Sequence, residues 1–413
     1  MKILVLGSLF RQSDESELLK KSKIGLQNQV NTFQWALIKG FDSIQSNPTD
    51  ILSVLPVGTY PKHYADLILK GKKWEHQPGA HDEEIWTVNL PFLKQNIRAI
   101  LCRKAIQKWI KNNEHEELFI IILYSYLPFL MAIKNVPQNV KIILIVPDIP
   151  EYMDLRSSIP LPIKIFRSLH DKIFYWLINR IDGFVLLTEQ MKYPLNIGTR
   201  PYVVVEGLVD HDLVKPSDNT IRDINKKVIL YTGSLNIQFG IMGLLDAIDL
   251  IVNDNYEFWI CGAGEAEKEI EKRCAHDKRI KYFGYVAKNE ILQLQQKATA
   301  LINPRNNEGE YTKYSFPSKT MEYLVSGKPV IMYKLDGIPD EYDPFLYYIA
   351  GNSPRDIANK IVEVIEKTQA ELDECGDRAR QFVMRNKNHI VQARKILSLC
   401  SSLKVPDLPH DLT

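Results

Sequence analysis

The chain has 413 residues, a formal net charge of +2 and 45% hydrophobic residues. So small a charge gives no global electrostatic reason for binding nucleic acid, and the length predicts two domains of similar size. The five cysteines are scattered and form no CxxC pair. Their number and spacing argue for a reducing compartment and against a disulfide framework or a zinc site.

No segment of the sequence is typical of a membrane span. The N-terminal run MKILVLGSLF is too short for a signal peptide and predicts a first buried strand instead. The longest uncharged run, residues 118–133, is shorter than the ~20 residues of a spanning helix and contains Pro128. We therefore predict a cytosolic (cytoplasmic) protein.

Short apolar runs alternate with longer amphipathic segments along the first half of the chain. This alternation is typical of βαβ units around a parallel sheet. We expect helices near 25–39, 95–112 and 163–179. The expected strands are residues 2–7, 50–57, 118–124, 141–148, 183–188 and 202–207.

A second series of α/β elements follows a polar stretch, which is the best candidate for a linker. Its expected strands are 227–233, 257–262, 280–285, 300–304 and 329–333, with helices near 240–252, 265–274 and 288–297 and closing helices over 355–402. We predict an N-terminal domain over 1–212, a linker over 213–226, a C-terminal domain over 227–385 and a last segment over 386–413. The default ligand site lies between two such domains, at the carboxyl ends of their strands.

Two glycine-containing loops follow predicted strands of the second domain. In YTGSLNIQFG, Gly233 and Ser234 come directly after a strand, and free N–H groups in such a loop can hold a phosphate. In WICGAGEAEKEIEK, Gly264 stands before a helix, but the third glycine of a GxGxxG pattern is absent. An ordinary strand-to-helix turn is the alternative for both loops, and a nicotinamide oxidoreductase is disfavoured.

The stretch YTKYSFPSKTMEYLVSGKPV, residues 311–330, predicts a helix with an open N-terminus. Ser318 is the expected cap, Lys319 adds a cation in the first turn, and Thr320 follows it. Glu322 is an acceptor when ionised and suits sugar hydroxyls. An anion site beside a polyol acceptor fits a sugar nucleotide, and the alternative is a capped core helix with a surface lysine and glutamate.

These motifs, in this order, resemble the donor-binding half of family 4 retaining glycosyltransferases of the GT-B fold. SFPSKTMEYLVSGKPVI, TALINPR and YTGSLNIQFGIMGLLDAI carry the resemblance, which is specific over about 227–335. It is closest to the branch that makes bacterial surface polysaccharides such as capsule. The resemblance implies two Rossmann-like domains and a last helix, HIVQARKILSL, that returns to the first domain.

The resemblance also implies roles for individual residues. Glu322 matches the second glutamate of the E-x7-E motif, which binds the ribose. The helix start at Ser318, Lys319 and Thr320 would face the diphosphate, and Gly233 and Ser234 match the phosphate-side loop. Gly264 lies near the base, and Gly25, beside Gln27 and Asn28, fits the glycine loop of the first domain that approaches the donor.

The chain departs from the family pattern in three ways. A histidine often seen near the middle of the N-terminal domain has no clear match, because LYSYLP occupies that region. Tyr314 stands where the first glutamate of E-x7-E is expected, and Phe239 stands where the family has a phosphate-binding lysine. We expect Arg305, in NPRNN, and Lys319 to supply the missing positive charge, since a guanidinium can hold two phosphate oxygens.

Three further features remain open from sequence. Asp148, just past a strand, could deprotonate an acceptor hydroxyl, or it could be a turn aspartate. The segments 60–81 and 159–180 combine basic and aromatic residues and could contact an anionic membrane. The helical stripe Ile165, Leu169, Ile173 and Leu177 is more simply explained as core.

We therefore predict a hexosyltransferase that moves a sugar from a nucleoside-diphosphate sugar to a glycan or lipid-linked glycan acceptor. No metal or other cofactor is required by this scheme, and nucleic acid is not an expected partner. Peripheral contact with the inner membrane face is an open alternative to a purely cytoplasmic location. Two rival functions also stay open: a GT-B nucleotide-sugar epimerase, and a non-catalytic nucleotide-sugar-binding protein.

Overall fold

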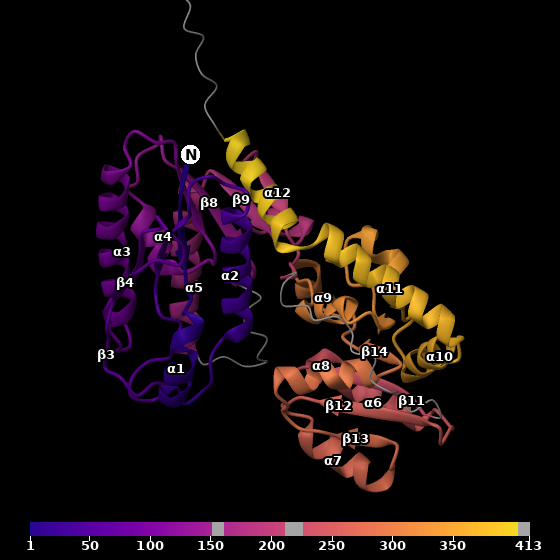
Figure 1. Ribbon diagram of the computed structural model, residues 1–413. Coiled ribbons are helices and arrows are strands. Elements are labelled where there is room, and N and C mark those ends of the chain that lie inside the picture. The colour runs from indigo at the N-terminus through magenta and orange to yellow at the C-terminus, as the bar shows by residue number, and fades with distance from the viewer. Residues whose placement is uncertain (151–160, 211–225, 404–413) are drawn as a thin grey trace, which may run out of the picture. The chain divides into compact units, whose positions relative to one another are not determined.

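The computed structural model describes residues 1–150, 161–210 and 226–403, and in helix α5 it describes the side chains from Ser168 onwards. The chain forms two compact units (Figure 1). The first contains Met1–Glu206 together with His389–Thr413, and the second is Gly207–Asn388. The predicted linker, 213–226, lies outside the described residues except for Lys226.

The first unit is built on an eight-stranded sheet in the order β10-β9-β8-β7-β1-β2-β5-β4. Its strands are parallel except β4, which runs antiparallel to β5. The central strands are buried along their whole length, as strands covered on both faces must be. The strands are β1 (Lys2–Gly7), β2 (Asp50–Ser53), β4 (Lys72–Trp74), β5 (Asp82–Glu84), β7 (Leu118–Ile122), β8 (Lys141–Val146), β9 (Gly183–Leu186) and β10 (Tyr202–Val204), and β3 (Ile68–Leu69) pairs separately with β6 (Thr87–Val88).

Helices cover this sheet, and the last helix of the chain is one of them. Helix α12 packs against α2, which confirms the predicted return of the C-terminal helix. The contact requires a glycine, because a Cβ at Gly40 would lie 2.5 Å from the carbonyl oxygen of His389. The helices of the unit are α1 (Glu15–Lys21), α2 (Asn28–Asp42), α3 (Leu93–Asn112), α4 (Leu127–Ile133), α5 (Leu161–Leu177) and α12 (His389–Ser402).

The second unit has a six-stranded parallel sheet in the order β13-β12-β11-β14-β15-β16. The strands are β11 (Lys227–Thr232), β12 (Tyr256–Cys261), β13 (Ile280–Tyr282), β14 (Ala300–Asn303), β15 (Val330–Met332) and β16 (Tyr347–Tyr348). The order in which successive strands join the sheet reverses between β11 and β14. In open α/β sheets such a reversal opens a crevice at the carboxyl ends of the two strands.

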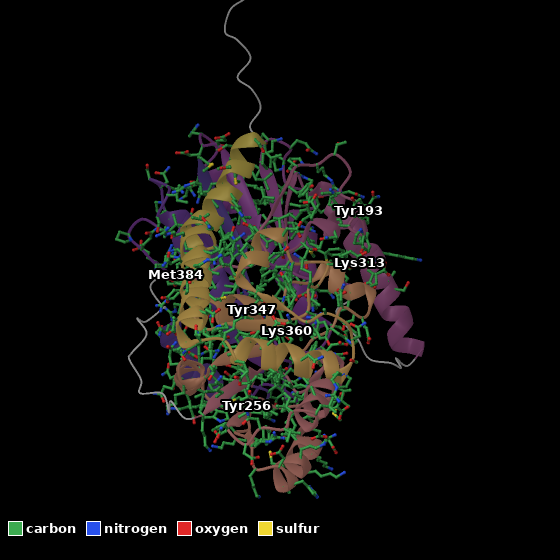
Figure 2. The ribbon with its side chains drawn as sticks, turned by 90° about the vertical axis from the view of Figure 1, so that its right-hand side faces the viewer. Tyr193, Tyr256, Lys313, Tyr347, Lys360 and Met384 are labelled. Atoms are coloured by element: carbon green, nitrogen blue, oxygen red, sulfur yellow. The ribbon has the colours of Figure 1, made fainter. Side chains whose placement is uncertain are left out.

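Six helices surround the second sheet. Helix α10 packs against α6, and α11 packs against α9. Figure 2 shows Tyr347 on β16 and Lys360 on α10. The helices are α6 (Ile241–Asp249), α7 (Glu267–His276), α8 (Lys288–Lys297), α9 (Ser318–Val325), α10 (Pro354–Ile365) and α11 (Gln369–Asn386).

The expected α/β elements are confirmed, with shorter strand ends. The run 50–57 continues as a loop after Ser53, and the carbonyls of Leu55 and Val57 in that loop accept hydrogen bonds from Arg98 and Lys94. The sequence analysis missed the short strands β3 to β6, whose two or three residues carry too little periodicity to be recognised.

The predicted core stripe on α5 is only partly right. Leu177 is buried, but Leu169 is 56% exposed and Ile173 is 36% exposed, while the side chain of Ile165 lies outside the described residues. Among the helices that the structure describes, none combines the length and the apolar character needed to cross a bilayer.

Candidate functional site

The loops after β11 and β12 pack tightly against each other in the second unit. Gly233 donates its N–H to the carbonyl of Cys261, and Leu235 donates to Ala263. A Cβ at Gly262 would lie 1.8 Å from the Gly233 oxygen, so only glycine fits there. Because the Gly233 amide is already engaged, Ser234 is the residue of this loop whose exposed backbone remains for an anion.

The structure also explains why residue 264 is a glycine. Its φ of +156° and the closeness of Asn236 exclude a side chain. Its N–H donates to the Glu267 carboxylate at 2.7 Å. The predicted contact with a base therefore cannot use this amide while Glu267 holds it.

Helix α9 begins at Ser318 with its N-terminus open. The N-cap is Pro317, and no side chain of the described residues caps the helix, so the prediction of Ser318 as the cap is wrong. The cause is that the helix starts one residue earlier than expected, which makes Ser318 its first helical residue. Helices α10 and α11, in contrast, close their N-termini with capping boxes at Ser353 and Thr368.

The first amides of α9 differ in what they bind. Thr320 donates its N–H to Pro317, and its hydroxyl is buried 3.9 Å from the sulfur of Met332, so its side chain does not face a ligand. For the N–H groups of Ser318 and Lys319, the described part of the chain provides no acceptor. These two amides and the helix dipole form a partial positive charge that favours an anion.

Glu322 and Lys319 are brought together in one hydrogen-bonded group. The ammonium of Lys319 donates to both Glu322 oxygens at 3.1 and 2.9 Å, and Gln295 donates to Oε1 at 2.7 Å. A carboxylate offers about four acceptor positions. Glu322 is thus held in place and keeps acceptor capacity, but the charge of Lys319 is already paired with Glu322 within the helix.

Arg305, which follows β14, lies among aromatic rings. Its guanidinium carbon is 5.4 Å from the ring centre of Phe239 and 5.0 Å from that of Tyr311, and Nη2 donates to Ser315 at 3.0 Å. Burial lowers the pKa of Arg305, Nε is buried without a hydrogen-bond partner, and no carboxylate of the described residues pairs with it. An enclosed cation without a counter-ion is unfavourable unless an anion binds beside it.

The sequence analysis missed the anchor of α9. Tyr323 is fully buried, and its hydroxyl accepts from the N–H of Thr232 at 2.9 Å and donates to the Thr232 carbonyl at 3.0 Å. These bonds fix α9 against the end of β11, beside Gly233. The apolar pattern of MEYLV marked Tyr323 as core, but nothing in it revealed the partner.

Most of the second unit matches a known protein family in sequence. Residues 226–367 match the model of the family described as "Glycosyl transferases group 1". Over these residues the chain is a group 1 glycosyltransferase, and solved structures show that the whole chain has the GT-B fold. It is therefore an enzyme that uses a nucleotide-sugar donor. No curated protein sequence matches the chain.

Solved structures show the same fold over the whole glycosyltransferase at low identity. A sucrose-phosphate synthase from Thermosynechococcus elongatus is 13% identical with a TM-score of 0.66, covering 98% of this chain and 99% of its own. The lipopolysaccharide outer core galactosyltransferase WaaB is 15% identical with a TM-score of 0.62, over 97% and 99% of the two chains. Anabaena Alr3699/HepE in complex with UDP is 17% identical with a TM-score of 0.63, over 97% and 100%.

Two predicted site residues of the glycosyltransferase belong to the first unit. Gly25 has a φ of +77° in the loop before α2, where its carbonyl accepts from the Ser22 hydroxyl at 2.6 Å. Asp148 follows β8 and is exposed as a residue, yet desolvation by the surrounding protein raises the pKa of its carboxyl. Burial and the nearby charge of Asp148 raise the pKa of Tyr124 to about 12.

Among the residues that the structure describes, no group of three His, Cys, Asp or Glu side chains is arranged to hold a metal ion. Tyr314, at the end of the short helical turn Glu310–Tyr314, takes the position of the first family glutamate.

Proposed function

We propose that the enzyme transfers a hexosyl group from a nucleoside-diphosphate sugar to a glycan or lipid-linked glycan, with retention of configuration, in polysaccharide biosynthesis. The observation that carries this proposal is the uncompensated guanidinium of Arg305. A donor diphosphate is the anion that a nucleotide-sugar enzyme would bring to it.

Arg305 replaces the lysine that the family resemblance expects at position 239. Its contact with the ring of Phe239 places a cation next to that residue, although the residue itself is neutral. An arginine on this neighbouring loop can therefore meet the same phosphate. Its fork can bind two phosphate oxygens, which a lysine cannot do with the same geometry.

The remaining groups divide the donor between them. The amides of Ser318 and Lys319 and the backbone at Ser234 would hold the diphosphate, and Glu322 would accept from the ribose hydroxyls. When the bond from the anomeric carbon to the diphosphate breaks, negative charge grows on the leaving oxygen. Preoriented donors around that oxygen stabilise the transition state more than the ground state.

Asp148 is the candidate base for the acceptor. In the transfer, the acceptor hydroxyl forms the new bond to the anomeric carbon and loses its proton, which Asp148 would accept. A pKa above the usual range makes an aspartate a stronger base than a fully hydrated one.

The relatives support a sugar-polymer acceptor. WaaB is described as a lipopolysaccharide outer core galactosyltransferase. A Staphylococcus aureus TarM mutant was solved with UDP and alpha-GlcNAc-glycerol. These descriptions concern those proteins, and they make uridine-diphosphate sugars the first donors to test here.

A donor panel tests the proposal. One tight nucleotide sugar at 100 times its Kd should stabilise the protein by about 2.7 kcal/mol, measured as a thermal shift. Glu322→Ala should weaken that shift, whereas Glu363→Ala on the outside of α10 should not. Undiminished stabilisation of the Glu322 variant would remove the ribose assignment, and absence of any stabilising sugar nucleotide would remove the donor proposal.

A further inference from the structure

The first unit exposes five large apolar side chains on elements that pack together. Ile68, Trp86, Phe92, Leu93 and Ile100 are each between 49% and 73% exposed. Ile68 lies in β3 and pairs with β6, and Trp86 precedes β6. Phe92 and Leu93 lie at the start of α3, which packs against β6, and Ile100 lies two turns further along that helix. Single exposed apolar residues are ordinary, but a contiguous set marks an interaction surface.

The chain holds Phe92 outward through an unusual backbone conformation. Phe92 has a φ of +64°, a region that a bulky residue rarely adopts. The carbonyl of Pro91 accepts from the N–H of Leu93 at 2.7 Å in the same turn. The turn therefore presents two neighbouring apolar side chains at the N-terminal end of α3, and strain of this kind concentrates at functional positions.

Lysines border the apolar group. A groove of about 470 Å³ between the β4–β5 pair and α3 is lined by Trp86, Leu101, Lys73, Lys104 and Lys108, and also by Glu83 and Glu84. Within the described part of the chain, these three lysines form no ion pair with a carboxylate. The outer face of α3 thus passes from apolar in its first turns to basic in its later turns.

We infer that this apolar–basic surface (Ile68, Trp86, Phe92, Leu93 and Ile100, with Lys73, Lys104 and Lys108) docks on an anionic lipid bilayer. A projecting apolar tip can enter the acyl boundary of a bilayer, and lysines beside it meet the lipid phosphates. The long lysine side chains can reach the headgroups while their stems cover apolar surface.

The exposed face of α5 is the competing surface in the same unit. It presents Leu169 and Trp176, but Lys134 lies 4.5 Å from the ring centre of Trp176 and covers it. The surface at α3 combines more exposed apolar side chains with three unpaired lysines, so it is the better match to an anionic bilayer.

Vesicle sedimentation tests the inference with the full chain and without donor or acceptor. The protein should sediment with phosphatidylcholine vesicles that contain phosphatidylglycerol, and less with phosphatidylcholine alone. The double variant Lys104→Gln/Lys108→Gln should bind about 30-fold more weakly, because each lysine near an anionic surface contributes about 1 kcal/mol. Phe92→Ser/Leu93→Ser should reduce binding about tenfold or more, since apolar groups that enter the bilayer are removed.

Matched variants on the second unit serve as controls. Val252 is 97% exposed and Lys268 lies on the outside of α7, so Val252→Ser and Lys268→Gln should bind vesicles as the wild type does. Wild-type binding by the Phe92/Leu93 variant overturns the inference, as does a loss caused by Leu169→Ser/Trp176→Ser alone. Binding to a soluble acidic polysaccharide but not to vesicles also overturns it.

The inference stands apart from the proposed reaction, although it would suit a lipid-linked acceptor. The surface variants should keep the thermal shift produced by the donor, because their side chains lie in the first unit and outside the donor residues. Loss of vesicle binding with an intact donor shift therefore tests the surface alone, and loss of the donor shift in Glu322→Ala tests the reaction alone.

Discussion

The two units both bury basic side chains near the carboxyl ends of their strands, but they satisfy them differently. In the first unit, Lys94 donates to the carbonyl of Val57, and Arg98 donates to Leu55 at 2.7 Å and to the Tyr126 hydroxyl at 3.0 Å. In the second, Arg305 donates to the Ser315 hydroxyl and lies against two aromatic rings, whereas it donates to no loop carbonyl of the described residues; Nε is buried without a partner in both Arg305 and Arg98. A cation that donates hydrogen bonds to loop carbonyls holds that loop in place, whereas a cation with fewer acceptors keeps donors available for an anion.

Lys94 shows what burial does to a basic side chain that donates to a loop carbonyl. Burial lowers its pKa to about 7, with the charge of Arg98 acting in the same direction. The loop after β2 gains two fixed carbonyls from this pair. Lys94 and Arg98 of the first unit are thus explained by structure, whereas Arg305 of the second unit is better explained by a ligand.

Replacement of Arg305 should give the largest effect. Arg305→Ala should lower turnover about 10²–10³-fold, the loss typical of removing one transition-state donor. Its free energy of unfolding should change by about 1 kcal/mol or less, because the unpaired charge contributes little to stability. Turnover and urea unfolding measure the two quantities, with Arg355→Ala on α10 as the control. Unchanged donor affinity and turnover would end the assignment.

The buried ionic cluster at His76 should make the stability of the first unit depend on pH. Burial alone would lower the pKa of His76, but hydrogen bonds to Asp42 at 2.9 Å and Asp82 at 2.8 Å raise it to about 9. A pKa raised in the folded state gives stability that is complete below the unfolded value of 6.5 and is lost as the pH rises through about 9.

The size of this effect is at most about 3.5 kcal/mol, since each pKa unit corresponds to about 1.4 kcal/mol. The stability difference between wild type and His76→Asn should be large at about pH 6 and small at about pH 10. Tryptophan fluorescence suits the measurement, because Trp35 and Trp74 lie beside His76. A difference that does not change with pH would show that His76 acts by packing alone.

Replacement of Arg98 should lower the free energy of unfolding rather than turnover, the opposite of what we expect for Arg305. Arg98→Met should lower the free energy of unfolding by about 2 kcal/mol, because the carbonyl of Leu55 loses a charged donor. The turnover of the folded fraction should stay near the wild-type value. Should Arg98→Met instead retain full stability and lose turnover, the contrast between the two units would be reversed.

The smallest effect is expected at the start of α9. Ser318→Ala should change stability by less than about 0.5 kcal/mol, since Ser318 does not cap the helix, whereas Ser353→Ala should cost about 1 kcal/mol through its capping box. Thermal unfolding of the two variants measures the difference. Equal losses would mean that Ser318 caps α9 in solution.

Local pattern was enough to predict the strands and most helices of the molecule. The apolar runs of β1 and β11 are continuous because both faces of each strand are buried, and such runs are visible without any partner. The order of strands in the sheets depends on pairing between distant residues, and it came from the structure.

The candidate site divides in the same way. The sequence predicted that Arg305, Lys319 and Glu322 lie near one another. Arg305 follows one predicted strand, and the other two residues lie in the helix that leads to the next strand. It could not show that Gly233 and Thr320 have their N–H groups engaged, that Lys319 pairs with Glu322, or that no carboxylate of the described residues pairs with Arg305. Those facts depend on which atoms of separate loops meet.

The sequence by itself therefore determined the elements, the glycine positions and the residue types at the donor end of the second sheet. Tertiary structure decided which of their polar groups remain for a ligand. The physical reason is that periodicity and turn chemistry act between residues close in sequence, whereas hydrogen-bond partners, burial and charge compensation are set by groups that only folding brings together.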